Sequence, residues 1–163
     1  MKKGILLVSA LYLAIAASAQ GVEKPMRTSA NASQIYLEVL GSGFFYSINY
    51  DGRFAKVENG AGFRIGLSGA GGDNGGYFAL PVQINTLIGT RGQYLELGAG
   101  ATFLSVNDIV DESNGHVVAT ATIGFRKQPF GRSGLTWRLA FTPFVIPGFG
   151  MLPYGGASLG YRF

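Results

Sequence analysis

Several residue types that stabilise or catalyse in exported proteins are scarce or missing in this chain of 163 residues. It has no cysteine, which excludes disulfides, thiol catalysis and cysteine-based metal centres. Charged residues make up only 13%, about half the share of an ordinary soluble domain. The 13 Lys and Arg only slightly outnumber the 9 Asp and Glu, and they are scattered, which argues against a nucleic-acid partner.

The chain also lacks any long apolar run beyond its N-terminus. Met1-Lys2-Lys3 is a short basic region, residues 5–17 are almost entirely apolar, and Ala17-Ser18-Ala19 has the small-x-small pattern that signal peptidase accepts. This apolar run is shorter than the roughly 20 residues that a membrane-spanning helix needs. We therefore expect residues 1–19 to be a cleaved signal peptide, so that the chain is exported.

The rest of the sequence divides into a polar leader and a long region of alternating residues. Residues 20–33 show no periodicity and are expected to form a flexible periplasmic leader. In residues 34–163, apolar residues alternate with small or polar ones, and glycine-rich turns separate the segments. The clearest alternating segments are residues 62–68, 78–85, 94–104, 116–126, 135–142 and 157–163. This pattern predicts antiparallel β-strands.

The composition of the two strand faces distinguishes a soluble sandwich from a membrane barrel. A sandwich points its apolar face inward and carries ample charge outward. Here the second face is mostly Gly, Ala, Ser and Thr with single charges, which suits the narrow lumen of an eight-stranded barrel. The sequence thus predicts an all-β protein, an eight-stranded antiparallel transmembrane up-and-down β-barrel over residues 34–163, in the bacterial outer membrane.

The expected orientation of the chain in the membrane predicts the number of strands. Bacterial barrels begin and end on the periplasmic side with an even number of strands. With Phe163 periplasmic, we expect extracellular loops and periplasmic turns to alternate back along the chain, at residues 148–153, 128–132, 107–115, 89–92, 69–76 and 51–60.

That order leaves seven strands in residues 44–163, so the eighth is expected at residues 34–40, before Gly41-Ser42-Gly43. This segment is shorter than the about 9–11 residues of a spanning strand. The alternative is that residues 34–51 form one strand bent at the glycines.

Single charges on the small-residue face predict a lumen filled by side chains. Because isolated charges in a barrel interior must be paired, we expect a structural network of ion pairs formed by Glu38, Arg64, Glu96, Arg126 and Arg138. Eight strands leave no channel of porin width. Aromatic residues near both ends of the strands predict two belts at the membrane interfaces, with Phe44, Phe45 and Phe144 in the outer one.

Five stretches carry a resemblance to a known family: IYLEVLGSGFFYSINYDGRF, LPVQINTLIG, YLELGAGATF, ATIGFRKQPFGRSGLTWRLAFTPF and PYGGASLGYRF. With them the chain resembles the small outer-membrane β-barrel proteins common in the Bacteroidetes group, over residues 35–163. The resemblance implies insertion into outer-membrane lipid by the barrel-assembly machinery. It also implies that the terminal Leu159, Tyr161 and Phe163 act as the assembly signal, and it brings no catalytic residue and no cofactor.

The single histidine, His116, is the one candidate for catalysis. Some small barrels are lipid A-modifying enzymes, and those that resemble serine hydrolases need a serine and a carboxylate beside the histidine. Their pattern places the serine two residues after the histidine, whereas His116 is followed by Val117-Val118. Asp111, Glu112 and Ser113 are nearby, on an expected loop, so a full constellation is not evident.

The loops give no stronger signal for metal binding. Residues 69–76 and 107–115 contain acids and glycines but do not match a defined calcium loop. We therefore expect no catalytic, cofactor or metal site, and a monomeric, non-enzymatic outer-membrane protein with an envelope structural or surface-interaction role. The alternatives are a lipid A-modifying enzyme with a rim site near His116 and a soluble lipocalin-like carrier.

Overall fold

A computed structural model of the chain describes residues 33–55, 57–72, 75–107, 114–146, 148 and 150–163. The expected signal peptide (residues 1–19) and all of the expected leader except Ser33 lie outside these residues. Within the described part of the chain, no helix has the length and apolar character to cross a membrane.

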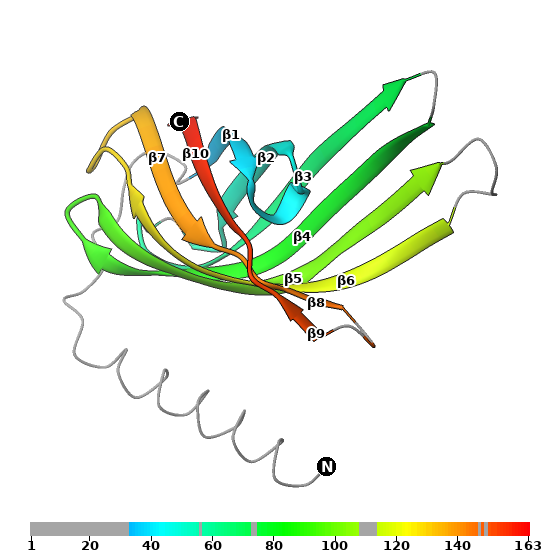
Figure 1. The fold of residues 1–163 in the computed structure, drawn as a ribbon. Helices are drawn as coiled ribbons and strands as arrows, with labels where there is room; N and C mark the ends of the chain where they lie inside the picture. Colours follow the sequence, from blue (N-terminus) through cyan, green and yellow to red (C-terminus); the bar gives the residue numbers. More distant parts are fainter. Residues whose placement is uncertain (1–32, 56, 73–74, 108–113, 147, 149) are drawn as a thin grey trace, which may run out of the picture.

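The described residues form ten hydrogen-bonded strands and one short 3-10 turn, η2 (Figure 1). They are β1 (Gln34–Leu40), η2 (Gly41–Gly43), β2 (Tyr46–Arg53), β3 (Gly60–Gly72), β4 (Gly75–Thr90), β5 (Gln93–Asn107), β6 (Asn114–Lys127), β7 (Gly134–Phe141), β8 (Phe144–Ile146), β9 (Gly150–Leu152) and β10 (Gly155–Arg162).

The sheet closes on itself. β1 pairs antiparallel with β2 on one side and with β10 on the other, with Gln34 opposite Arg162 and Leu40 opposite Gly156. The remaining pairings run from β2 to β7 through neighbours in the chain, and β7 pairs with β10. The predicted closed antiparallel barrel is therefore confirmed.

The ten strands make eight passages along the barrel wall. The pairs Phe141–Gly155 and Phe144–Leu152 share one register, so β7 with β8 and β9 with β10 each continue a single passage. Across the interruption, the Thr142 N–H donates to the Tyr154 carbonyl at 2.7 Å. Residues 34–40 form a strand of their own, so the first of the two sequence-based alternatives is correct.

The registers also fix the stagger of the barrel. Starting at Gln34, successive register partners around the wall are Asp51, Arg64, Gln83, Gly100, Thr120, Phe144 and Leu152. The pairing of β1 with β10 ends at Leu40 opposite Gly156. If this register is extended, Leu152 lies opposite position 44, so one circuit of the wall ends ten residues beyond its start at Gln34. A stagger of this kind accompanies a strand tilt of about 35–45°.

The strands differ greatly in length. β3 to β6 have 13 to 16 residues, whereas β1 and β2 have 7 and 8. We call the end of the barrel near Phe163 the inner mouth and the opposite end the outer mouth. The β3–β4 and β5–β6 hairpins project well beyond the β1–β2 turn at the outer mouth (Figure 1).

One expected loop is therefore largely strand. The sequence predicted a loop over residues 69–76, but Gly69 pairs with Phe78 and Gly72 pairs with Gly75. The glycines give no alternating side-chain pattern, because they have no side chain, yet their backbone groups join the ladder. The prediction was wrong here because the strand signal was read from side chains alone.

The two faces of the wall have inverted polarity. Lumen-facing side chains are polar and buried, as with Arg64 at 0% exposure, whereas outward-facing ones are apolar and exposed, as with Leu135 at 71%. The same alternation runs along β1, β2 and β7. Aromatic rings gather outside near the inner mouth, where Phe125 and Trp137 lie 5.5 Å apart between ring centroids. The interior is thus polar and the exterior apolar.

The inverted polarity predicts a depth-dependent penalty for exposed charge. Leu139 points outward near the middle of its passage, and Leu135 points outward near the inner mouth of the same strand. In phospholipid vesicles, we expect Leu139→Arg to lower the free energy of unfolding by about 2–4 kcal/mol and Leu135→Arg by about 0–1 kcal/mol. Denaturant titration measures both. If both substitutions change the free energy of unfolding equally and negligibly, as on a water-exposed surface, the outward apolar face does not lie in hydrocarbon.

Candidate functional site in the barrel lumen

The lumen holds a continuous network of ion pairs at its centre. The five predicted residues, Glu38, Arg64, Glu96, Arg126 and Arg138, come from five different strands, and their side chains are all buried. Each lies at an inward position of its strand, because every second residue faces the lumen. The wall therefore brings together charges that lie up to 100 positions apart in the sequence.

Arg138 connects two of the acids. Its guanidinium lies 2.5 Å from a Glu38 carboxylate oxygen and 2.8 Å from one of Glu96. It also lies 4.9 Å above the ring of Tyr36, a favourable cation–π distance. Gly160 makes room for that ring, since a Cβ at this position would be 2.3 Å from the Tyr36 Cβ.

Arg126 extends the network toward the inner mouth. It lies 2.7 Å from Glu96 and 3.0 Å from Asp51. Asp51 also contacts Arg53 at 2.6 Å, and it accepts a hydrogen bond from the Asn85 amide at 2.6 Å. Asp51 and Arg53 were not among the predicted lumen residues, because residues 51–60 were read as a turn, whereas β2 continues through Arg53.

Arg64 contacts mostly neutral groups. Its nearest carboxylate, that of Glu38, lies 3.8 Å away. Its guanidinium donates to the Ser42 hydroxyl at 3.0 Å and to the Tyr36 phenol at 3.2 Å, and it also donates to the Gln83 side-chain carbonyl. Because these acceptors come from β1, η2 and β4, Arg64 ties the β1–β2 hairpin to the neighbouring wall.

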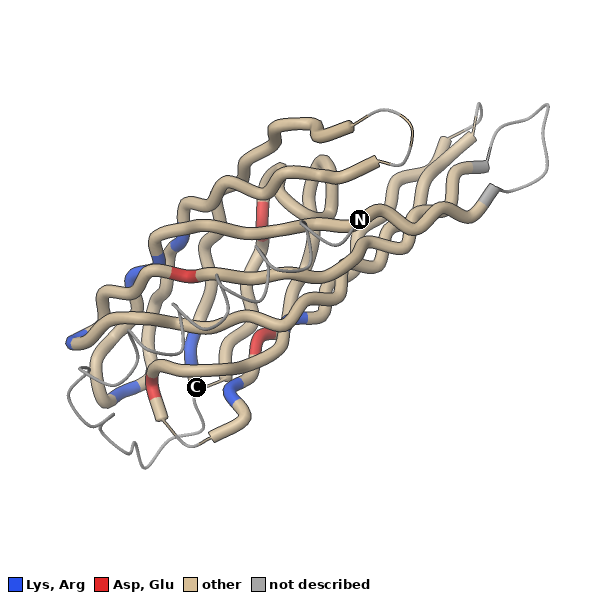
Figure 2. The backbone as a smooth tube through the Cα atoms, turned by 90° about the horizontal axis from the view of Figure 1, so that it is seen from below, with Lys and Arg blue, Asp and Glu red and all other residues tan. Residues whose placement is uncertain are grey.

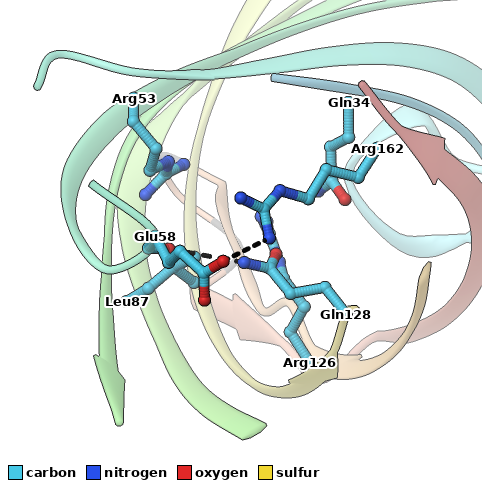
Figure 3. Close-up of a pocket in the computed structure, with 7 residues that line it drawn as sticks. All are labelled: Gln34, Arg53, Glu58, Leu87, Arg126, Gln128 and Arg162. Carbon is cyan, nitrogen blue, oxygen red and sulfur yellow. Dashed lines mark hydrogen bonds and ion pairs between the residues drawn. The ribbon is translucent and has the colours of Figure 1, made fainter. Parts of the chain in front are cut away.

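A turn closes the inner mouth. Glu58, between β2 and β3, accepts a hydrogen bond from Arg162 at 2.9 Å (Figure 3). It accepts another from the Tyr94 phenol at 2.9 Å. Arg162 also donates to the Pro129 carbonyl at 2.6 Å, so two turns are joined across the opening. Glu58 and Arg162 also line a small space at this end of the lumen, together with Gln34, Arg53, Leu87, Arg126 and Gln128, and this space has no room for a water molecule.

Glu58 and Arg162 were also missed from the sequence. Glu58 lies in a turn without periodicity, so no pattern points to it. Arg162 did carry a signal, because it shares the inward face of the last strand with Ser158 and Gly160.

A second element closes the outer part of the lumen. Turn η2 folds inward, so that Ser42 is fully buried and its carbonyl accepts a hydrogen bond from the Thr102 hydroxyl at 2.9 Å. Phe44, which directly follows η2, stacks on Phe144 with ring centroids 4.7 Å apart. The Tyr154 hydroxyl donates to the Phe44 carbonyl at 2.9 Å.

This inward fold corrects one prediction and has a conformational cost. Phe44 and Phe144 were expected in the outer aromatic belt, but Phe144 has no exposed surface and lies inside the barrel. Leu40 and Phe44 flank the turn with φ angles of 62° and 71°, a region that costs a residue with a Cβ about 1–3 kcal/mol. The contacts within the lumen must therefore outweigh this strain.

Charge in the lumen is nearly balanced. Among the described residues, Arg53, Arg64, Arg126, Arg138 and Arg162 face Glu38, Asp51, Glu58 and Glu96. Isolated buried charges are very costly, so near-neutrality is required for a closed interior. These charges lie in one half of the barrel, and the described residues at the outer ends of the projecting hairpins, 68–72, 75–79, 104–107 and 114–118, include no Lys, Arg, Asp or Glu (Figure 2).

His116, the candidate for catalysis, is among the described residues. His116 lies at the outer end of β6, exposed and opposite Leu104. The nearby Asp111, Glu112 and Ser113 lie outside the described residues. In the part of the chain that is described, no three His, Asp or Glu side chains converge in a way that could hold a metal ion.

Comparison with known proteins found no family model, curated protein or solved structure that matches this chain. The fold and the lumen therefore carry the functional argument by themselves. A closed eight-stranded barrel with an apolar exterior and a filled polar interior is consistent with the class of outer-membrane barrel proteins.

The central network predicts a large penalty for removing Arg138. Arg138→Met keeps much of the side-chain volume but leaves Glu38 and Glu96 without their shared cation. We expect a loss of about 3–5 kcal/mol in the free energy of unfolding, as for a broken buried ion pair. Arg132→Met, at an exposed turn, is the matched control and should change it by less than about 0.5 kcal/mol. Equal effects of the two substitutions in denaturant titrations would mean that the network is not desolvated.

Proposed function

We propose that the protein is a non-enzymatic outer-membrane protein whose filled barrel serves envelope structure or surface interaction. The observation that carries the proposal is the inverted polarity of the wall, with ionised side chains inside and large apolar ones outside. Burying charge while exposing apolar surface is unfavourable in water and favourable in a bilayer. Hydrocarbon around the barrel accounts for both faces at once.

The filled lumen favours a structural or surface role over transport. Contacts close the interior at three levels: the Glu58 turn at the inner mouth, the ion pairs at the centre, and η2 with Phe44 and Phe144 above them. A solute would have to break buried ion pairs to pass. The β3–β4 and β5–β6 hairpins project furthest at the outer mouth (Figure 1), which places them well for contact with other molecules.

The proposed route to the membrane uses both ends of the chain. Residues 1–19 would direct export, and the barrel-assembly machinery would insert the barrel as a monomer into outer-membrane lipid. Leu159, Tyr161 and Phe163 are proposed as the signal for that machinery. Their support is position: all three side chains are exposed on the outside of β10 and its end, the strand that completes the barrel.

A lipid A-modifying enzyme is the second candidate, and the exposed His116 side chain at the outer mouth is the observation that favours it. Along β6 the imidazole shares the face of Val118 and Thr120, so a lipid headgroup would have to reach over the rim of the barrel to contact it. If His116 acts as a base, His116→Ala should change the lipid A acylation pattern in mass spectra of whole envelopes. We expect an unchanged pattern, matching that of a strain with the wild-type chain. A shift in acylation would replace the leading proposal with the enzymatic one.

Fractionation and gel migration test the leading proposal. We expect the protein in the outer-membrane fraction, requiring detergent for release, with a start at or near Gln20. Unheated samples should migrate faster than boiled ones, because a closed barrel stays compact in mild detergent. A folded monomer that remains in plain buffer after detergent is removed would instead indicate the lipocalin-like carrier.

A further inference from the structure

The barrel wall separates between β2 and β3 toward the outer mouth. The β2–β3 register runs from Arg53 opposite Gly62 to Ile48 opposite Leu67. Beyond that point the described register pairs Tyr46 only with β1, and residues 68–72 of β3 only with β4. Strands β2 and β3 are therefore neighbours in the wall that separate toward the outer mouth.

The separation leaves a groove on the outside of the barrel, with a volume of about 360 Å³. Leu37 and Ile48 form one side, and Leu67 and Phe78 form the other. None of the described residues that line it is charged, and its surface is almost wholly apolar. The groove opens directly onto the exposed apolar band of the exterior, of which Ile48 and Leu67 are part.

Tyr46 takes the place of the missing strand contact. Its hydroxyl donates a hydrogen bond to the Gly69 carbonyl, across the gap from β2 to β3. The phenol satisfies a polar backbone group that would otherwise face the gap, so the groove stays compatible with an apolar occupant.

We propose that this groove binds one acyl chain of an outer-membrane lipid. The inference rests on the proposed function, because it needs the exterior to face lipid. An empty apolar groove would forfeit dispersion contacts along its lining, and a hydrocarbon chain restores them. Pairing with a second copy through the β3 edge is disfavoured, because the Gly69 carbonyl is already engaged by Tyr46.

The test measures lipid that stays bound to the purified barrel. The barrel, released in detergent, is mixed with a defined phosphatidylethanolamine and examined by native mass spectrometry. Ile48→Trp fills the groove with an indole, and Ile123→Trp places the same ring on β6, away from it; Ile48 and Ile123 are both 56% exposed. Gel migration before and after boiling shows that each variant is folded.

We expect the wild-type barrel and the Ile123→Trp variant each to keep one bound lipid. For Ile48→Trp, the fraction of protein that carries a lipid should be at least tenfold lower. Equal retention by all three, or no retention by the wild type, would overturn the inference. A lipid-free dimer that Ile48→Trp disrupts would overturn it in favour of an interface between copies. A heat-modifiable membrane protein without bound lipid defeats only this inference, whereas a protein that is folded without detergent defeats the proposed function as well.

Discussion

The pairing of β1 with β10 is the contact on which the rest of the structure depends. It gives the first and last passages a second neighbour, so that a ten-strand sheet becomes a closed wall. In the proposed membrane location, hydrocarbon would offer no hydrogen bonds to a free strand edge, so closure is what allows the outward face to be apolar. The inward face then encloses a space from which water is largely excluded, and its charges must satisfy one another.

At its centre the interior meets this demand with connected ion pairs, while Arg162 and Glu58 form a separate pair at the inner mouth. Arg138 and Arg126 share Glu96, and Arg126 shares Asp51 with Arg53. Removing one member therefore affects at least two others, which makes the network specific as well as stabilising. The Glu58 turn and η2 add neutral and charged hydrogen bonds at the two ends. Because the lumen is filled by these side chains, the projecting hairpins are the part of the barrel best placed for contact with other molecules.

The fold could be predicted because strands with alternating side chains report their own orientation. Glu38 and Glu96 could be assigned to the lumen from the parity of their strands alone. Glu58 could not, because a turn has no parity, and Asp51 could not, because the end of β2 was placed too early. The outer end of β3, residues 69–72, was missed for a different reason: glycines carry no side-chain pattern although their backbone pairs. The inward turn of η2 depends on contacts from distant strands, such as Thr102, which no local pattern contains.

The span of the lumen contacts has a consequence for the order of events during assembly. Arg138 reaches Glu38 across 100 positions of the chain, and Arg162 reaches Glu58 across 104. Neither contact can form until the C-terminal strands have been made and have met the N-terminal ones. A half-finished wall would have to keep these ions hydrated, and so it would resist leaving the aqueous side. Only the closed wall pairs these ions with one another, and in the proposed outer-membrane location an incomplete barrel would have to carry them unpaired into hydrocarbon.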